Sequence, residues 1–258
     1  MKLRRLKTAW RVVQGITGTD VLRVISGMRG VPSFLRDACT YSRLNQRDSL
    51  QLRWTELYPI FHERFEKAGA ANGHYFHQDL WAAKRIYQRR PQDHVDVGSR
   101  VDGFVAHVLV FMPITVVDIR ALDSKLESLS FLRDDATHMV KFADGSVDSL
   151  SSLHAAEHFG LGRYSDPIDP DACFNFMRSL QRVLRPGGRL YFSLPVGRER
   201  VEFNAHRVFD PATILFVFDQ LSLLTFSYVD DRGDLHENVD VSSLPQSEYA
   251  CGLFEFTK

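Results

Sequence analysis

From residue 93 onward, short apolar runs alternate with helix-like stretches, and this rhythm constrains the fold more than any other feature of the chain. The runs are HVDVGS, TVVDIR, SVDSLSSL and GRLYFSLPV. Apolar strands that alternate with helices are typical of a parallel sheet with helices on both faces. Near the C-terminus, SLLTFSYVDD and YACGLFEFTK predict two more strands at one edge of the sheet. We therefore expect an α/β protein.

Residues 1–90 have a different character, because they are rich in Arg and Leu and show helical spacing. Between residues 52 and 65, large apolar side chains recur at steps of three and four, as on one face of a helix, which Pro59 could kink. We expect an N-terminal helical cap or lead-in over residues 1–90 and a main domain over residues 91–258.

A second helix is expected in the lead-in from Asp79, a residue type that caps helix N-termini. Its apolar face would consist of Leu80, Ala83, Ile86 and Tyr87. The preceding residues His74, Tyr75 and His77 would form either a lid over a ligand or ordinary loop packing.

The composition excludes some classes of protein. Lys plus Arg and Asp plus Glu both count 32, so no net charge favours a nucleic acid partner. The three cysteines, Cys39, Cys173 and Cys251, are widely spaced without a CxxC or Cys/His cluster in the sequence. They suggest neither a disulfide framework nor a zinc finger, and they fit a reducing cytoplasm.

The opening residues MKLRRLKTAWRVV resemble a signal peptide superficially, but Arg11, Gln14 and Asp20 interrupt the apolar stretch. We interpret them as an amphipathic helix that either packs on the domain or contacts an anionic membrane surface, which would be the inner face of the membrane. No run approaches the roughly 20 apolar residues of a membrane span.

Two motifs at predicted strand ends suggest ligand binding. VDVGSRVDG at residues 95–103 ends a strand in a glycine turn, which lets a ligand approach the backbone, and the next helix N-terminus favours an anionic group. Asp118 follows about twenty residues later, at the end of the next strand, where a carboxylate can accept both hydroxyls of a ribose. A surface Asp at a strand end is the alternative.

The segment DGSVDSL at residues 144–150, followed by RVLRPGGRL after an amphipathic helix, resembles the class I S-adenosylmethionine-dependent methyltransferases. The resemblance covers about residues 90–258 and implies a Rossmann-like domain with a mostly parallel seven-stranded sheet. It implies that Asp96, Gly98 and Ser99 line the methionine end of the cofactor. Asp118 would take the ribose, and Asp135 with Ala136 would frame the adenine. The cofactor-facing residues are then Asp96, Gly98, Ser99, Arg100, Asp118, Ile119, Asp135, Ala136 and Ser152.

The glycine turn departs from the Gly-x-Gly-x-Gly pattern of that superfamily. Arg100 and Asp102 occupy the second and third glycine positions, and Gly103 is displaced by one. Arg100 could pair with the cofactor carboxylate or point to solvent. A chain that keeps the fold without binding the cofactor is a further alternative.

A closer resemblance, which includes HYFHQDLWAAKRI at residues 74–86 and EFNAHRVFD at residues 202–210, is to a bacterial methyltransferase-like family of unassigned function. Members of that family accompany genes for surface polysaccharides. The resemblance implies a saccharide or lipid-linked glycan as the substrate.

The stretch SSLHAAEHFG at residues 151–160 supplies the expected acceptor-side residues. On a helix, His154, Glu157 and His158 would share one face, and His206 would join them from the loop after the fifth strand. The four form a plausible set of divalent-metal ligands. The pattern is similar to the Glu-x-x-Glu-His plus later His of metal-dependent O-methyltransferases, with His154 in place of the first Glu. The replacement leaves open whether the ion is Mg²⁺, Mn²⁺ or another divalent metal.

Two other interpretations of this stretch stay open: a histidine that acts as a general base without a metal, and a purely structural helix start. We predict an O-methyltransferase that acts on a sugar hydroxyl of a surface glycan. The alternatives are 2′-O-methylation of an RNA end, against which the neutral charge argues, and a non-catalytic partner in glycan assembly. The sequence leaves the oligomeric state open.

Overall fold

The computed structural model describes the chain except for residues 1–14, 17, 19, 20, 62, 66 and 67. The amphipathic helix expected at residues 1–13 therefore lies outside the described residues. The chain divides into two compact units, residues 1–70 and residues 71–258. Within the described ranges, no helix combines the length and the apolar character needed to cross a bilayer.

The first unit contains the helix α2 (Val21–Leu44) and the 3₁₀ turns η1 (Trp54–Glu56) and η2 (Glu63–Phe65). The single helix predicted over residues 52–65 is wrong, because these two short turns stand in its place. Pro59 explains the interruption: it lacks an amide hydrogen and disfavours helical geometry at the residue before it. The ring of Phe61 packs edge-on against Phe34 of α2, with 5.5 Å between the ring centroids.

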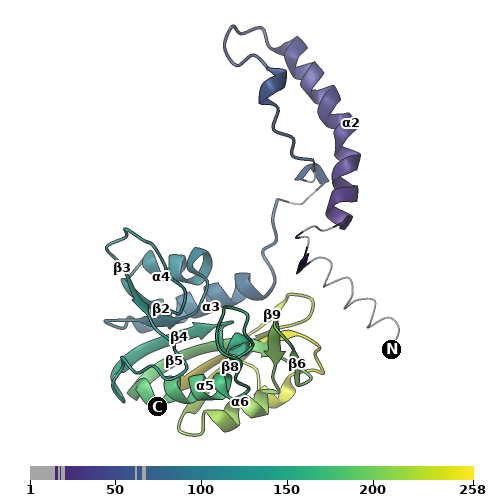
Figure 1. Cartoon of the computed structure of the whole chain (residues 1–258). Helices are drawn as coiled ribbons and strands as arrows, with labels where there is room; N and C mark the ends of the chain where they lie inside the picture. Colours follow the sequence, from purple (N-terminus) through teal and green to yellow (C-terminus); the bar gives the residue numbers. More distant parts are fainter. Residues whose placement is uncertain (1–14, 17, 19–20, 62, 66–67) are drawn as a thin grey trace. The chain divides into compact units, whose positions relative to one another are not determined.

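The second unit is built on a mixed sheet, shown in Figure 1. Its strands are β1 (Val95–Val97), β2 (Ile114–Asp118), β3 (Leu129–Arg133), β4 (Val147–Leu153), β5 (Leu184–Val196), β8 (Ser222–Val229), β9 (Leu235–His236) and β10 (Ala250–Thr257). The order is β3-β2-β1-β4-β5-β10-β8-β9. Strands β1 to β5 pair in parallel, and β10 lies antiparallel between β5 and β8.

The described sheet has eight strands rather than the expected seven. The additional strand is the two-residue β9, which pairs with Tyr228 and Val229 of β8 after a tight turn. The two C-terminal strands expected at one edge are confirmed as β8 and β10. The predicted Rossmann-like methyltransferase architecture is thus present, with a hairpin added to one edge.

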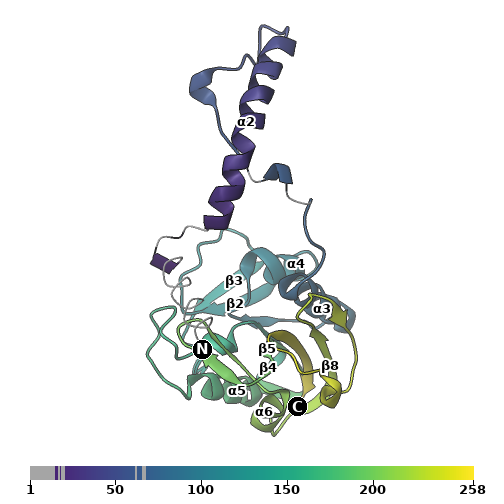
Figure 2. The same ribbon diagram turned by 90° about the vertical axis from the view of Figure 1, so that its right-hand side faces the viewer.

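Helices cover both faces of the sheet, as the two views in Figures 1 and 2 show. The helix α3 (His74–Arg89), the π-helical turn η3 (Val101–Val105) and α4 (Ala106–Leu109) pack on one face around one apolar core. The helices α5 (Ala172–Val183) and α6 (Pro211–Val217) pack on the other face around a second, larger core. The remaining described elements are β6 (Arg200–Glu202), β7 (His206–Val208), η4 (Ala156–His158) and η5 (Val241–Ser243).

The helix α3 begins at His74, earlier than expected, so Asp79 does not cap it. Asp79 is instead buried, and its Oδ1 accepts a hydrogen bond from Gln78 Nε2 at 3.0 Å. The expected apolar face was also misplaced, because Leu80 and Tyr87 are exposed. The buried face holds Gln78, Asp79, Trp81, Ala82, Ala83 and Ile86. A polar side of this helix therefore faces the interior near its N-terminus.

Gly103 has a packing role next to this helix. A Cβ at this position would lie 2.4 Å from Asp79 Oδ2. The displaced glycine of the turn motif is therefore explained by the close approach of α3 rather than by a ligand.

The helix and turn that carry the superfamily resemblance fold as expected. The stripe of Met177, Leu180, Val183 and Leu184 is completely buried. The helix α5 ends at Val183. In the pairing of β5 with β4, Leu184 lies opposite Val147 and Arg189 lies opposite Ser149, so residues 185–188 form a bulge in β5. After this bulge, residues 189–196 of β5 pair with the full length of β10.

Candidate functional site

Two adjoining cavities lie at the carboxyl ends of β1, β2 and β4. The strand order reverses between β1 and β4, and the crevice outside such a reversal is where parallel α/β sheets bind ligands. The cavities have volumes of about 270 Å³ and about 630 Å³. Six residues line both of them: Gly98, Asp118, Arg120, His154, His158 and Tyr164. They form the boundary between the two spaces.

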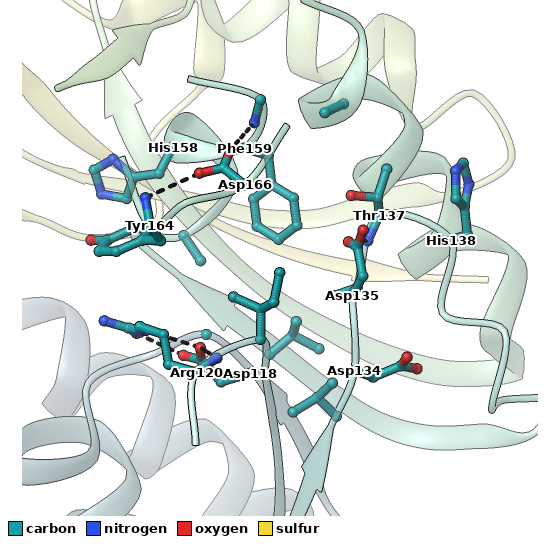
Figure 3. Close-up of a pocket in the computed structure, with 18 of the residues that line it drawn as sticks. Asp118, Arg120, Asp134, Asp135, Thr137, His138, His158, Phe159, Tyr164 and Asp166 are labelled. Carbon is teal, nitrogen blue, oxygen red and sulfur yellow. Dashed lines mark hydrogen bonds and ion pairs between the residues drawn. The ribbon is translucent and has the colours of Figure 1, made fainter. Parts of the chain in front are cut away.

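The smaller cavity has apolar side chains on its wall together with the polar side chains that Figure 3 labels. Ile119 and Ala136 line it, and so does Asp135, whose Oδ1 accepts a hydrogen bond from the Thr137 amide at 2.9 Å. These are three of the residues expected to face the adenosine part of the cofactor. Phe159 adds an aromatic ring to the same wall.

The larger cavity is more polar. Ser99, Arg100, Glu157 and His206 line it. Tyr75, from the segment expected to form either a lid or loop packing, also lines it, as does Tyr249. The Arg100 guanidinium lies 4.8 Å from the centre of the Tyr75 ring and pairs with Asp102 at 3.2 Å. Arg100 therefore points toward this cavity with its charge already balanced by a neighbour.

Asp118 stands between the two cavities, and its carboxylate holds the side chain of Arg120 (Figure 3). Arg120 Nε donates to Oδ1 at 3.0 Å, and one terminal nitrogen donates to Oδ2 at 2.6 Å. The same guanidinium lies 4.5 Å from the centre of the Tyr164 ring. The expected ribose acceptor is therefore occupied by an arginine in this structure.

A buried chain of hydrogen bonds supports the turn after β1. Asp96 Oδ1 accepts from the hydroxyls of Ser99 at 2.6 Å and Ser151 at 2.5 Å. Because Ser151 donates to Asp96, it accepts from Nε2 of His94 at 2.9 Å, and Nδ1 of His94 then accepts from Ser149 at 2.8 Å. Burial lowers the pKa of His94 to about 3, which agrees with this neutral ring.

Burial also raises the pKa of Asp96 to about 6, although hydrogen bonds from Ser151 and Ser99 oppose the increase. Asp96 and Ser152 are completely buried and line neither cavity. Asp96 thus holds the turn from beneath rather than facing a ligand in this structure.

Gly98 forms the floor where the cavities meet. Its φ of 72° lies in the left-handed region, which glycine adopts without the steric cost that other residues incur. A Cβ at this position would lie 3.0 Å from the Cβ of Ala155. The absence of a side chain keeps the space above the turn open.

His158 has a defined tautomer. Its Nδ1 donates to the carbonyl oxygen of Ala205 at 2.7 Å, so the lone pair of the neutral ring is on Nε2. Nε2 lies 3.7 Å from Glu157 Oε1. Burial lowers the pKa of His158 to about 4, so the ring is neutral near pH 7.

Glu157 is almost completely buried, with 1% of its surface exposed. Burial raises its pKa to about 8. Its Oε2 has no hydrogen-bond partner among the described residues. The larger cavity therefore contains a carboxyl group that is protonated in much of the population near neutral pH, beside a neutral imidazole.

His154 points in another direction. The strand β4 continues through Leu153, His154 adopts a φ of 52°, and the 3₁₀ turn η4 begins only at Ala156. The sequence predicts that His154, Glu157 and His158 share one face of a helix. That prediction is wrong, because no single helix contains all three residues. The His154 ring contacts the rings of His74 and Tyr75, with centroid separations of 5.6 Å and 5.2 Å.

The ligand set predicted for a metal, His154, Glu157, His158 and His206, does not meet as a compact group of donor atoms among the described residues. Among the described residues, the donor atoms that do form a compact group belong to His74, His154 and Cys251 and lie within 4.8 Å of one another. The predicted four-residue set stays a prediction.

Among the lining residues that the sequence analysis did not place in the site are Arg120, Arg163, Tyr164 and Tyr249. Position could have identified two of them. Arg120 follows the end of β2 by two residues, and Tyr249 directly precedes β10, whose antiparallel course begins at the edge where the parallel strands end.

Solved structures of similar fold include methyltransferases. A putative sarcosine dimethylglycine methyltransferase from Galdieria sulphuraria matches with a TM-score of 0.51 and 12% identity, over 70% of this chain and 84% of that chain. An N1-methyltransferase from Burkholderia thailandensis, solved with 1,6-didemethyltoxoflavin and S-adenosylhomocysteine, matches with a TM-score of 0.48 and 16% identity, over 88% of this chain and 89% of that one. The first of these two matches shows that the chain has the Rossmann-like fold of methyltransferases.

Residues 94–247 match the family described as "Caenorhabditis protein of unknown function, DUF268". The match covers more than half of the chain, and the chain therefore belongs to this family. No curated protein matches the sequence.

Proposed function

We propose that the protein is an S-adenosylmethionine-dependent methyltransferase that methylates a hydroxyl group of a saccharide. The observation that carries the proposal is the pair of cavities that meet over Gly98 at the carboxyl edge of the sheet. One space has the chemistry for an adenosine and the other has the chemistry for a hydroxyl acceptor. The fold agrees with this activity, although fold alone does not decide function.

The residues of the smaller cavity fit the proposed cofactor. Asp118 and Asp135 offer carboxylates to hydroxyl and amino groups, and Ile119 and Ala136 offer apolar contact to a purine. Gly98 leaves room that a Cβ would fill. When bound, S-adenosylmethionine supplies an electrophilic methyl group, and the ribose hydroxyls would take the place of the Arg120 guanidinium on Asp118.

The residues of the larger cavity fit a hydroxyl acceptor. Transfer of a methyl group to a hydroxyl releases its proton, and a base within hydrogen-bond distance speeds such a step by about 10²–10⁴-fold. His158 is suited to this role because the Ala205 carbonyl keeps its lone pair on Nε2. Glu157 Oε1 lies 3.7 Å from the same nitrogen, and in the fraction of molecules in which this carboxyl group is ionised it would stabilise the imidazolium.

A saccharide fits the side chains around this base. Tyr75, Tyr164 and Tyr249 line the larger cavity, and each combines an aromatic face with a hydroxyl group. A sugar ring presents apolar C–H faces and a rim of hydroxyls, so it can stack and donate hydrogen bonds at once. A glycan or its lipid-linked precursor is therefore the proposed substrate class.

The test is transfer of labelled methyl groups from S-adenosylmethionine to a panel of saccharides, comparing the wild-type protein with His158→Gln. We expect base-stable methyl ethers with the wild type and a large loss of rate with the variant at unchanged cofactor affinity. Transfer only to amines, or cofactor binding without transfer to any saccharide, would contradict the proposal.

A second arm of the same assay tests the divalent metal that the sequence predicts on His154, Glu157, His158 and His206. Loss of transfer after exhaustive chelation, with recovery on addition of Mg²⁺ or Mn²⁺, would support that ligand set. Activity that chelation leaves unchanged would contradict it and leave His158 as the base.

A further inference from the structure

Three elements of the second unit bring nitrogen and sulfur donors together beneath the larger cavity. His74 is the first residue of α3, His154 follows β4, and Cys251 is the second residue of β10. Because β10 runs antiparallel to β5, with Cys251 opposite Pro195, its first residues reach the edge where β4 ends. Donor atoms that are far apart in the sequence therefore converge.

The distances fit a small metal ion. One ring nitrogen of each histidine and the Sγ of Cys251 lie within 4.8 Å of one another. Ligands on a tetrahedral zinc ion lie about 3.4–3.6 Å apart, given Zn–N of about 2.0–2.1 Å and Zn–S of about 2.3 Å. Cys251 Sγ lies 3.8 Å from Nδ1 of the His154 ring, so the thiol already lies beside this imidazole.

The tautomer of His154 leaves a buried lone pair. Its Nδ1 lies 2.6 Å from Gln78 Oε1, an oxygen that only accepts, so Nδ1 carries the hydrogen and Nε2 carries the lone pair. Only 8% of His154 is exposed, and its Nε2 has no hydrogen-bond partner among the described residues. A buried acceptor without a partner is unfavourable, and a metal ion would satisfy it.

Gln78 supplies the support that metal-bound histidines have. Histidine ligands usually donate their second ring nitrogen to a fixed acceptor, which sets the orientation of the ring. Gln78 Oε1 is itself fixed, because it accepts from Ser193 Oγ at 2.7 Å.

We propose that His74, His154 and Cys251 form a binding site for Zn²⁺ that ties α3 and β10 to the end of β4. Two imidazoles and a thiolate are the ligand types that zinc prefers, and they leave one tetrahedral position for a water or a substrate atom. The Cys251 thiol loses its proton to solvent when the ion binds, as zinc ligation requires. The ion would hold His154 at the boundary of the two cavities, and the proposal does not depend on which acceptor is methylated.

The test uses the tag-free, full-length protein, freed of metal with a chelator and titrated with Co²⁺ and with Zn²⁺ against a colorimetric indicator. We expect one tightly bound ion per chain that contributes a thiolate-to-cobalt charge-transfer band, and Zn²⁺ should displace it. Cys251→Ser should remove the band, and His74→Gln should weaken zinc binding about tenfold or more. Zinc should also raise the melting temperature of the wild type.

Matched controls separate the site from non-specific binding. Cys173→Ser removes another buried thiol, and His77→Gln removes another histidine of the same helix. Both should bind the ion as the wild type does. A wild-type titration without the thiolate band overturns the proposal, and this result needs no variant to fold. Equal losses of zinc affinity in Cys173→Ser and Cys251→Ser also overturn it.

Discussion

Replacing Arg120 with alanine should tighten the binding of S-adenosylhomocysteine, because the arginine occupies the carboxylate that the ribose would use. Both oxygens of Asp118 accept hydrogen bonds from the Arg120 side chain. In Arg120→Ala, Asp118 keeps its bond from the backbone amide of residue 120 but no longer has to release a guanidinium. A change that removes a positive charge from the cavity wall should thus improve affinity for the nucleoside.

The size of the effect follows from the exposure of the pair. The Arg120 side chain is 54% exposed and that of Asp118 is 16% exposed. Ion pairs at such positions contribute about 0.2–1 kcal/mol, and the contact with the Tyr164 ring adds about 0.5–1 kcal/mol. If the bound cofactor breaks most of these Arg120 interactions, the binding free energy of Arg120→Ala should be about 1 kcal/mol more favourable than that of the wild type. This corresponds to a dissociation constant that is roughly fivefold lower.

Isothermal titration calorimetry of the wild type and three variants measures this directly. Asp118→Asn should weaken the binding of S-adenosylhomocysteine by about tenfold or more. The reason is that hydrogen bonds from the ribose hydroxyls to a charged carboxylate contribute about 1.5–3 kcal/mol. Arg178→Ala, an exposed arginine on α5 that lines neither cavity, is the charge-matched control. Weaker binding by Arg120→Ala than by this control would refute the reasoning and indicate that Arg120 itself contacts the ligand.

Three further outcomes are expected. His158→Gln should lower kcat by about 10²–10⁴-fold while the dissociation constant of S-adenosylhomocysteine stays within a factor of two or so; an equal loss of both would indicate a structural role. Gly98→Ala should lower the free energy of unfolding by about 1–2 kcal/mol, because φ is 72° there, and should weaken cofactor binding, whereas unchanged binding would show that the turn is not part of the cofactor site. Burial lowers the pKa of His94 from 6.5 to about 3. Between these two pH values the unfolded chain binds a proton at His94 that the folded chain does not bind. As the pH falls through this range, the group therefore lowers the free energy of unfolding by about 1.4 kcal/mol per pH unit. The raised pKa of Asp96, about 6 instead of 3.8, has the opposite effect on stability, so the comparison must isolate His94. As the pH is lowered from 6.5 to 4.5, the melting temperature of His94→Gln should rise relative to that of the wild type. A difference in melting temperature that stays constant over this pH range would contradict the lowered pKa of His94.

The sheet could be predicted because its signals are local. Each parallel strand is a short apolar run, and α5 has an apolar stripe that ends at a Pro-Gly-Gly turn. The lead-in was harder to predict, because Pro59 overrides the helical spacing around it. The start of α3 was missed because the first buried residues of this helix, Gln78 and Asp79 in its second turn, are polar rather than apolar.

The site could be predicted only to the level of strand ends. Asp118, Asp135 and His158 line the cavities because residues that follow parallel strands share one edge of the sheet. The direction of a side chain depends on backbone angles that the sequence does not reveal. At His154 a φ of 52° turns the ring away from Glu157 and toward His74 and Cys251. The Cys/His group was invisible in the sequence because its members lie on three separate elements.

The most direct measurement for the central claim is a calorimetric titration of S-adenosylmethionine and of S-adenosylhomocysteine into the wild-type protein. The two cavities over Gly98, with Asp118 and Asp135 on their walls, predict that one molecule binds per chain with micromolar affinity or better. Asp135→Ala should weaken this binding. No detectable heat at millimolar ligand would contradict the account and would instead favour a non-catalytic protein that retains the methyltransferase fold.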